Sequence, residues 1–126
     1  MGTPLWELFA KEAREVERYT KIYGIKLIFY SKEGEPVSTL YADSGKVKRE
    51  KGDLSALGNV VVRREGWTLK TRSLNWDNRK KKIWTRDEFV YEGKEGKVTG
   101  KGFESDPDLK HIVIKEKYTE EGEFEE

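Results

Sequence analysis

A β-hairpin pattern between residues 58 and 76 constrains the fold of this chain more than any other stretch. Residues 60–62 are three consecutive valines, whose β-branched side chains favour extended backbone, and Gly66 follows where the apolar run has stopped. Apolar and polar residues then alternate from Trp67 to Thr71, which is typical of a strand with one buried face. The apolar phase changes after Thr71, and this predicts a bulge or bend near residues 72–73.

The same hairpin pattern of strand, turn and strand repeats along the chain. A short word of apolar, any and small residue recurs about every 30 residues, beginning at Leu8, Leu40, Leu69 and Val98. Turn signals containing glycine, proline or charged residues separate runs of alternating apolar residues at intervals of about 8–12 residues. The chain is therefore predicted to be all-β, built from repeated hairpins as a sandwich, roll or open barrel.

The two ends of the chain are the least constrained. Thr3 and Pro4 suit the start of a helix that would cover residues 3–20, whereas the repeat word at Leu8 favours strands there. We favour strands and keep the helix as the alternative. Residues 119–126 are acidic and are expected to form a mobile tail. At this length, residues 1–126 are expected to form a single domain.

Composition excludes several classes of protein. The chain is 39% charged, yet four Trp, six Tyr and five Phe supply aromatic surface that disordered tails lack. The formal net charge is +1, so no overall field attracts nucleic acid, and no nucleic-acid partner is expected. The absence of cysteine removes disulfides, thiolate catalysis and cysteine-bound zinc. No apolar run approaches the length needed to cross a bilayer.

Residues that could carry chemistry have simpler explanations. His111 is the only histidine, and it stands before an apolar strand with no catalytic motif around it. Asp106 and Asp108 flank a proline, which is typical of a turn. The basic run 79–82, between Trp76 and Trp84, is most simply a solvated turn. We therefore expect no enzyme activity, no catalytic residue, no metal and no cofactor.

Several short words resemble a known family. They are Gly58-Asn-Val, Gly66-Trp-Thr-Leu-Lys-Thr, Leu74-Asn-Trp-Asp, Ile83-Trp-Thr and Gly100-Lys-Gly-Phe-Glu-Ser-Asp. Their order and spacing, over about two thirds of the chain from residue 40 to residue 118, resemble the LptC family of lipopolysaccharide-export proteins. More broadly, they resemble the OstA-like family that includes LptA. The chain departs from the LptC pattern in beginning where that family's N-terminal membrane anchor should already have ended.

The resemblance implies a fold and a function. The fold is an open, twisted, antiparallel β-jellyroll in the periplasm, facing the inner membrane, whose apolar interior holds the acyl chains of lipopolysaccharide. Such a protein accepts lipid from an inner-membrane ABC transporter and passes it to an LptA-like jellyroll. The implied partners are lipopolysaccharide or lipid A, the transporter and the LptA-like protein, with head-to-tail self-association as a further use of the same edges. An interaction domain with a packed core and no lipid ligand is the alternative.

Strand parity and the family's ligand position together give candidate residues. Apolar residues of shared parity are expected to form the lipid groove, namely Val60, Val62, Leu69, Ile83, Phe89, Ile112 and Ile114. An open sheet leaves its last strand unpaired on one side, so this strand is a template for strand addition. The expected partner edge comprises His111, Val113, Lys115 and Lys117.

Overall fold

The computed structural model describes residues 6–122, and these residues form eight β-strands and no helix. The strands are β1 (Trp6–Val16), β2 (Tyr19–Tyr30), β3 (Pro36–Lys48), β4 (Asp53–Arg64), β5 (Trp67–Asp77), β6 (Lys82–Gly93), β7 (Gly96–Ser105) and β8 (Ile112–Gly122). The segment expected to be helix or strand is thus a strand from Trp6, while Thr3 and Pro4 lie outside the described residues. Accordingly, no described segment is a helix of the length and apolarity that a membrane span requires.

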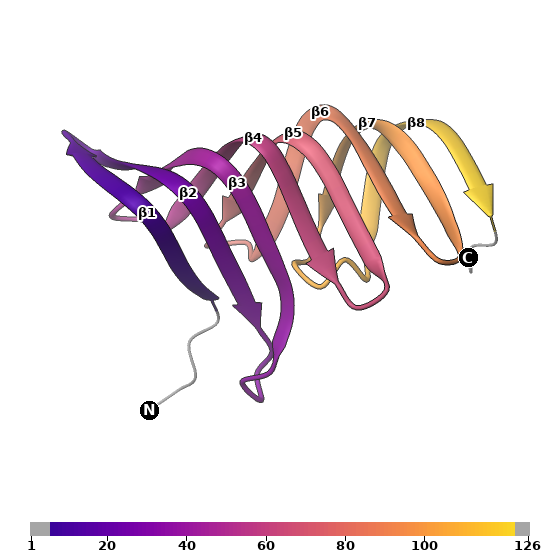
Figure 1. The fold of residues 1–126 in the computed structure, drawn as a ribbon, viewed down its shortest axis with the longest axis horizontal. Coiled ribbons are helices and arrows are strands. Elements are labelled where there is room, and N and C mark those ends of the chain that lie inside the picture. Colours follow the sequence, from indigo (N-terminus) through magenta and orange to yellow (C-terminus); the bar gives the residue numbers. More distant parts are fainter. Residues whose placement is uncertain (1–5, 123–126) are drawn as a thin grey trace.

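The strands form one antiparallel sheet in which each strand pairs with its neighbours in sequence, in the order β1 to β8 (Figure 1). The sheet coils into successive arches, and the first and last strands lie at opposite ends of the molecule (Figure 1). Within residues 6–122, β1 and β8 are each paired on one side only. The prediction of an all-β, open antiparallel jellyroll made of hairpins is confirmed.

Strand β8 continues further than the sequence indicated. Residues 119–122 belong to it, and Thr119 pairs with Thr99 of β7 while Gly122 pairs with Gly96. The rest of the expected acidic tail, residues 123–126, lies outside the described residues. Mobility of the segment 119–126 stays a prediction.

Each central strand is bent near its middle. The pairing register shifts between Tyr41 and Ser44 in β3, and between Leu57 and Val60 in β4. A further shift between Thr71 and Asn75 confirms the bulge predicted at residues 72–73. Bulges add curvature to a strand, so these shifts fold the sheet until its two halves face each other.

Register rows explain how the core forms. One row across the sheet pairs Leu8 with Leu27, then Leu40, Val62, Leu69, Tyr91 and Val98. A second row on the other half runs through Val47, Leu54, Trp76 and Ile83. The rings of Phe29 and Trp76 meet edge to face at a centroid distance of 4.8 Å. The core is therefore the contact between the two inner faces of one bent sheet.

Candidate functional site

Five of the seven predicted groove residues lie at the centre of this core. Val60, Val62, Leu69, Ile83 and Phe89 are all buried, with Phe89 the most exposed at 3%. They belong to one cluster with residues that the sequence reasoning did not single out, including Ile25, Leu27, Phe29, Leu40, Leu74, Trp76 and Phe103. The same alternation of buried and exposed residues marks most of these positions, so the strand pattern carried the signal for them as well.

The other two predicted groove residues lie at the rim. Ile112 and Ile114 of β8 pair with Ser105 and Phe103 of β7, and they are half-buried against the core. They face the same side as Phe103, which is buried, so their predicted orientation agrees with the register. The candidate site thus has a closed centre and a more accessible wall along β8.

One loop closes the interior between β3 and β8. Ser38 Oγ of β3 donates a hydrogen bond of 2.6 Å to the carbonyl oxygen of Pro107, in the turn after β7. Leu109, two residues later, is 2% exposed, and its backbone has φ +60°. This φ is energetically unfavourable for any residue other than glycine. The sequence predicts a turn at Asp106-Pro107-Asp108, and the structure has one there, but the turn signal gives no sign of a buried leucine beyond it.

A second contact closes the interior beside β1. Trp6 Nε1 donates a 3.0 Å hydrogen bond to Oδ1 of Asn78, which lies in the turn between β5 and β6. The Asn78 side-chain amide donates in turn to the carbonyl oxygen of Lys51, at 3.0 Å, and its backbone N–H donates to Asp53 Oδ1 at 2.9 Å. Asn78 therefore ties the first strand to two turns of the opposite half.

Charged side chains also hold the closing loop, which is the segment 106–111 between β7 and β8. Asp106 accepts a hydrogen bond from the Lys82 ammonium, and His111 Nδ1 lies 3.3 Å from its other carboxylate oxygen. The hydrogen bond from Lys82 lowers the pKa of Asp106, and the same bond raises the pKa of Lys82. The pair joins β6 to the turn that precedes β8.

The predicted partner edge is accessible. Val113 is 56% exposed, and His111, Lys115 and Lys117 are exposed as well. Lys117 pairs internally with Glu120 at 2.7 Å. Lysines along an unpaired strand discourage indiscriminate strand addition, as the sequence indicated. The edge of β1 is also accessible, with Phe9 48% exposed.

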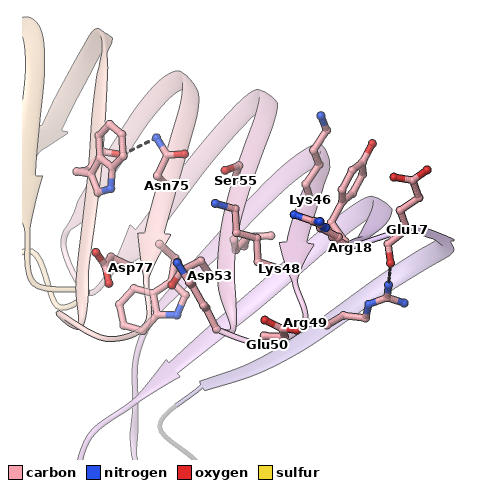
Figure 2. A pocket seen from close by; sticks show the side chains of 15 residues that line it. Glu17, Arg18, Lys46, Lys48, Arg49, Glu50, Asp53, Ser55, Asn75 and Asp77 are labelled. Atoms are coloured by element: carbon pink, nitrogen blue, oxygen red, sulfur yellow. Dashed lines mark hydrogen bonds between the residues drawn. The ribbon is translucent and has the colours of Figure 1, made fainter.

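A hollow of about 910 Å³ lies near the turns that join β1 to β2 and β3 to β4 (Figure 2). Lys46, Lys48, Ser55, Asn75 and Asp77 line it from β3, β4 and β5, and the β1–β2 turn adds Glu17 and Arg18 (Figure 2). Within residues 6–122, no group of three histidine or acidic side chains is placed to hold a metal ion.

Comparison with known proteins gives a family and a fold. A model of the family described as lipopolysaccharide-assembly, LptC-related, matches residues 1–120. Among solved structures, the chain is similar to LptH of Pseudomonas aeruginosa, described as the LptA homologous periplasmic component of the lipopolysaccharide transport device. The TM-score is 0.65 at 10% identity, over 89% of this chain and 82% of that one. No curated protein sequence matches the chain.

Proposed function

Because the chain belongs to the LptC-related family of lipopolysaccharide-assembly proteins, we propose that it binds the acyl chains of lipopolysaccharide between the two inner faces of its bent sheet. The chain has a role in lipopolysaccharide transport, as its family does. The proposal adds the position of the lipid, between Val60, Val62, Leu69 and Phe89 on one half of the sheet and Ile83 on the other, with Ile112 and Ile114 as the rim.

The chemistry of the interior supports this position. Two facing apolar surfaces bury an acyl chain at about 0.8 kcal/mol per methylene, which gives a lipid with several chains a large driving force. The side chains of the described interior touch one another, so a lipid enters only when the two halves separate. Two hydrogen bonds must break for this separation, the one from Ser38 to Pro107 and the one from Trp6 to Asn78.

The two unpaired edges fit a relay between similar proteins. We assign the β1 edge to an inner-membrane ABC transporter, which delivers the lipid, and the β8 edge at His111, Val113, Lys115 and Lys117 to an LptA-like jellyroll, which receives it. Strand addition across both edges would join the interiors of successive jellyrolls. We place the domain, residues 1–126, in the periplasm facing the inner membrane. Head-to-tail self-association would use the same two edges.

Photo-crosslinking tests the lipid position with matched neighbours. A crosslinking residue at Val62 or Phe89 should label lipid A, because both side chains point inward and are buried. The same crosslinking residue at Val61 or Val90 should not label lipid A. Val61 pairs with Lys70 and Val90 pairs with Thr99, and the side chains of this row point away from the core. Labelling confined to the outward pair would place the lipid on the other face of the sheet.

The packed interior favours one alternative. An interaction domain that binds partners through its edges, with no lipid ligand, would need every described core residue to stay in contact. In that case neither the inward nor the outward pair would label lipid A, while an LptA-like partner would still bind. The same crosslinking series therefore separates the two functions.

A further inference from the structure

The outer face of the same strands carries a second concave surface. The hollow of about 910 Å³ adjoins another of about 640 Å³, and the two share Asp77 and Trp84. Together they extend from the β1–β2 turn across β3 to β6 and on to Lys101 and Lys115 of β7 and β8. We call this combined surface the outer trough.

The register places the trough opposite the core. One row pairs Lys46 with Ser55, Ser55 with Asn75, Asn75 with Trp84 and Trp84 with Glu104. The next residues along these strands, which include Leu54, Trp76 and Ile83, are buried in the core. Since successive side chains of a strand alternate between faces, the row through Lys46 and Trp84 points outward. The charged and polar side chains of the trough therefore lie on the outer face, while the core residues Leu54, Trp76 and Phe103 contribute to its floor.

The trough concentrates positive charge. Ten cations line it against six carboxylates, although the whole chain has a formal net charge of only +1. The cations are Arg18, Lys46, Lys48, Arg49, Lys51, Lys80, Lys82, Arg86, Lys101 and Lys115. Among the described residues, only Arg49, with Glu15, and Lys82, with Asp106, form ion pairs in this set. The other cations remain available to an anion in a concave surface, where their fields add.

Two partly exposed aromatic rings and several polar groups also line the trough. Trp84 lies where the two hollows meet, with the Arg86 guanidinium 5.7 Å from its ring centre. Tyr19 lies at the other end, with Lys46 Nζ 5.0 Å from its ring centre. Ser55 and Asn75 add hydroxyl and amide groups between them. Aromatic faces stack on sugar rings, lysines and arginines bind phosphate, and amides and hydroxyls bind sugar hydroxyls.

From this combination we propose that the outer trough binds a phosphorylated saccharide. A concave surface fits a discrete sugar chain better than a flat bilayer, and the hydroxyl and amide groups give it partners that a phosphate alone would not need. Binding of the saccharide requires no acyl chain, because the cations, hydroxyl and amide groups that would contact it lie on the outer face of the sheet.

Titration calorimetry with a fully deacylated, doubly phosphorylated glucosamine disaccharide tests the proposal. The variant Lys46→Glu/Lys48→Glu should bind it about tenfold more weakly or worse, as expected when two charge-assisted contacts become repulsive. The charge-matched control Lys26→Glu/Lys32→Glu, at exposed positions outside the trough, should keep the affinity of the unmodified protein. Trp84→Leu should also weaken binding, because it removes the stacking surface while leaving the charge in place.

Three results would overturn the proposal. The first is equal weakening in the trough and control variants, which would make the binding a general charge effect. The second is equal affinity for inorganic phosphate, and the third is binding of anionic phospholipid vesicles with no binding of the disaccharide. Lipid A crosslinking at Val62 in the same variants should stay unchanged, so a failure of the trough and a failure of the interior lipid site give different results.

Discussion

Ser38 on β3 and Pro107 in the turn before β8 are joined by a 2.6 Å hydrogen bond, although 69 positions separate them in the chain. Every pairing within the sheet joins neighbouring strands, so this bond is one of the few links between distant parts of the molecule. Leu109 enters the core from the same loop. This loop is therefore one of the contacts that must open before the two halves of the sheet can part, together with the Trp6 to Asn78 bond.

Locking this loop should block lipid entry. The double variant Ser38→Cys/Pro107→Cys introduces the only two cysteines in the chain, at positions already in contact. After oxidation, labelling of lipid A by a crosslinker at Val62 should fall several-fold, because the halves are held together. Reduction should restore it. The single variant Ser38→Cys, which has no partner, is the control, and full labelling by the oxidised protein would mean that lipid enters elsewhere.

Two glycines should differ in cost for different physical reasons. Gly66 has φ +82° with no atom near the position of an added Cβ, so Gly66→Ala should destabilise by about 1 kcal/mol through backbone strain alone. A Cβ at Gly100 would collide with the carbonyl oxygen of Glu116 and lie 3.1 Å from the Phe89 ring, so Gly100→Ala should cost more. Denaturant unfolding measures both, and an unchanged midpoint for Gly66→Ala would refute the strain at that turn.

Acid should weaken the closing loop through Asp106. Its pKa is lowered from the ordinary value of 3.8, mainly by the Lys82 hydrogen bond, so the ionised form is favoured in the folded state. The resulting stabilisation is present above pH 3.8 and is lost as the pH falls through the lowered pKa. Melting temperatures of the unmodified protein and Asp106→Asn should therefore differ at neutral pH and converge in acid. A constant difference across the range would show that the charge of Asp106 contributes nothing.

Shortening β8 should separate docking from folding. Deleting residues 110–126 should abolish binding to an LptA-like jellyroll, but it also removes Ile112 and Ile114, which pack against the core. Deleting only 116–126 keeps both isoleucines and removes an exposed half-strand. The shorter deletion should stay folded, label lipid A at Val62 and bind the partner more weakly in a pull-down, because it removes Lys117 and half of the edge but keeps His111, Val113 and Lys115. If partner binding survives both deletions, docking does not use β8.

The sequence predicts the parts of this fold that depend on neighbouring residues. Alternation placed Val60, Val62 and Leu69 on the inner face, and the change of phase after Thr71 located the bulge in β5. These features can be predicted from the sequence because strand periodicity and turn chemistry depend on neighbouring residues. Family resemblance supplied the open jellyroll, which periodicity alone leaves among several all-β architectures.

Features that depend on distant residues were not predictable in this way. Leu109 follows a strong turn signal, and it is buried in a core made by distant strands, in a loop that the Ser38 to Pro107 bond links to β3 across 69 positions. The outer trough is equally hidden, because its cations come from several strands and turns and the overall charge is nearly zero. Both arise from how the sheet bends, and the bend is a sum of several register shifts.

The sequential order of the strands has a consequence for how the chain acquires its shape. Each hairpin needs only its own two strands and a short turn, so hairpins form on the microsecond scale as soon as the residues are available. The Trp6 to Asn78 and Ser38 to Pro107 bonds span 72 and 69 residues, and their closure entropy delays them. We therefore expect the hairpins to pair before the two halves of the sheet meet, and an amphiphile present in that interval would compete with the protein's own second half for the apolar face.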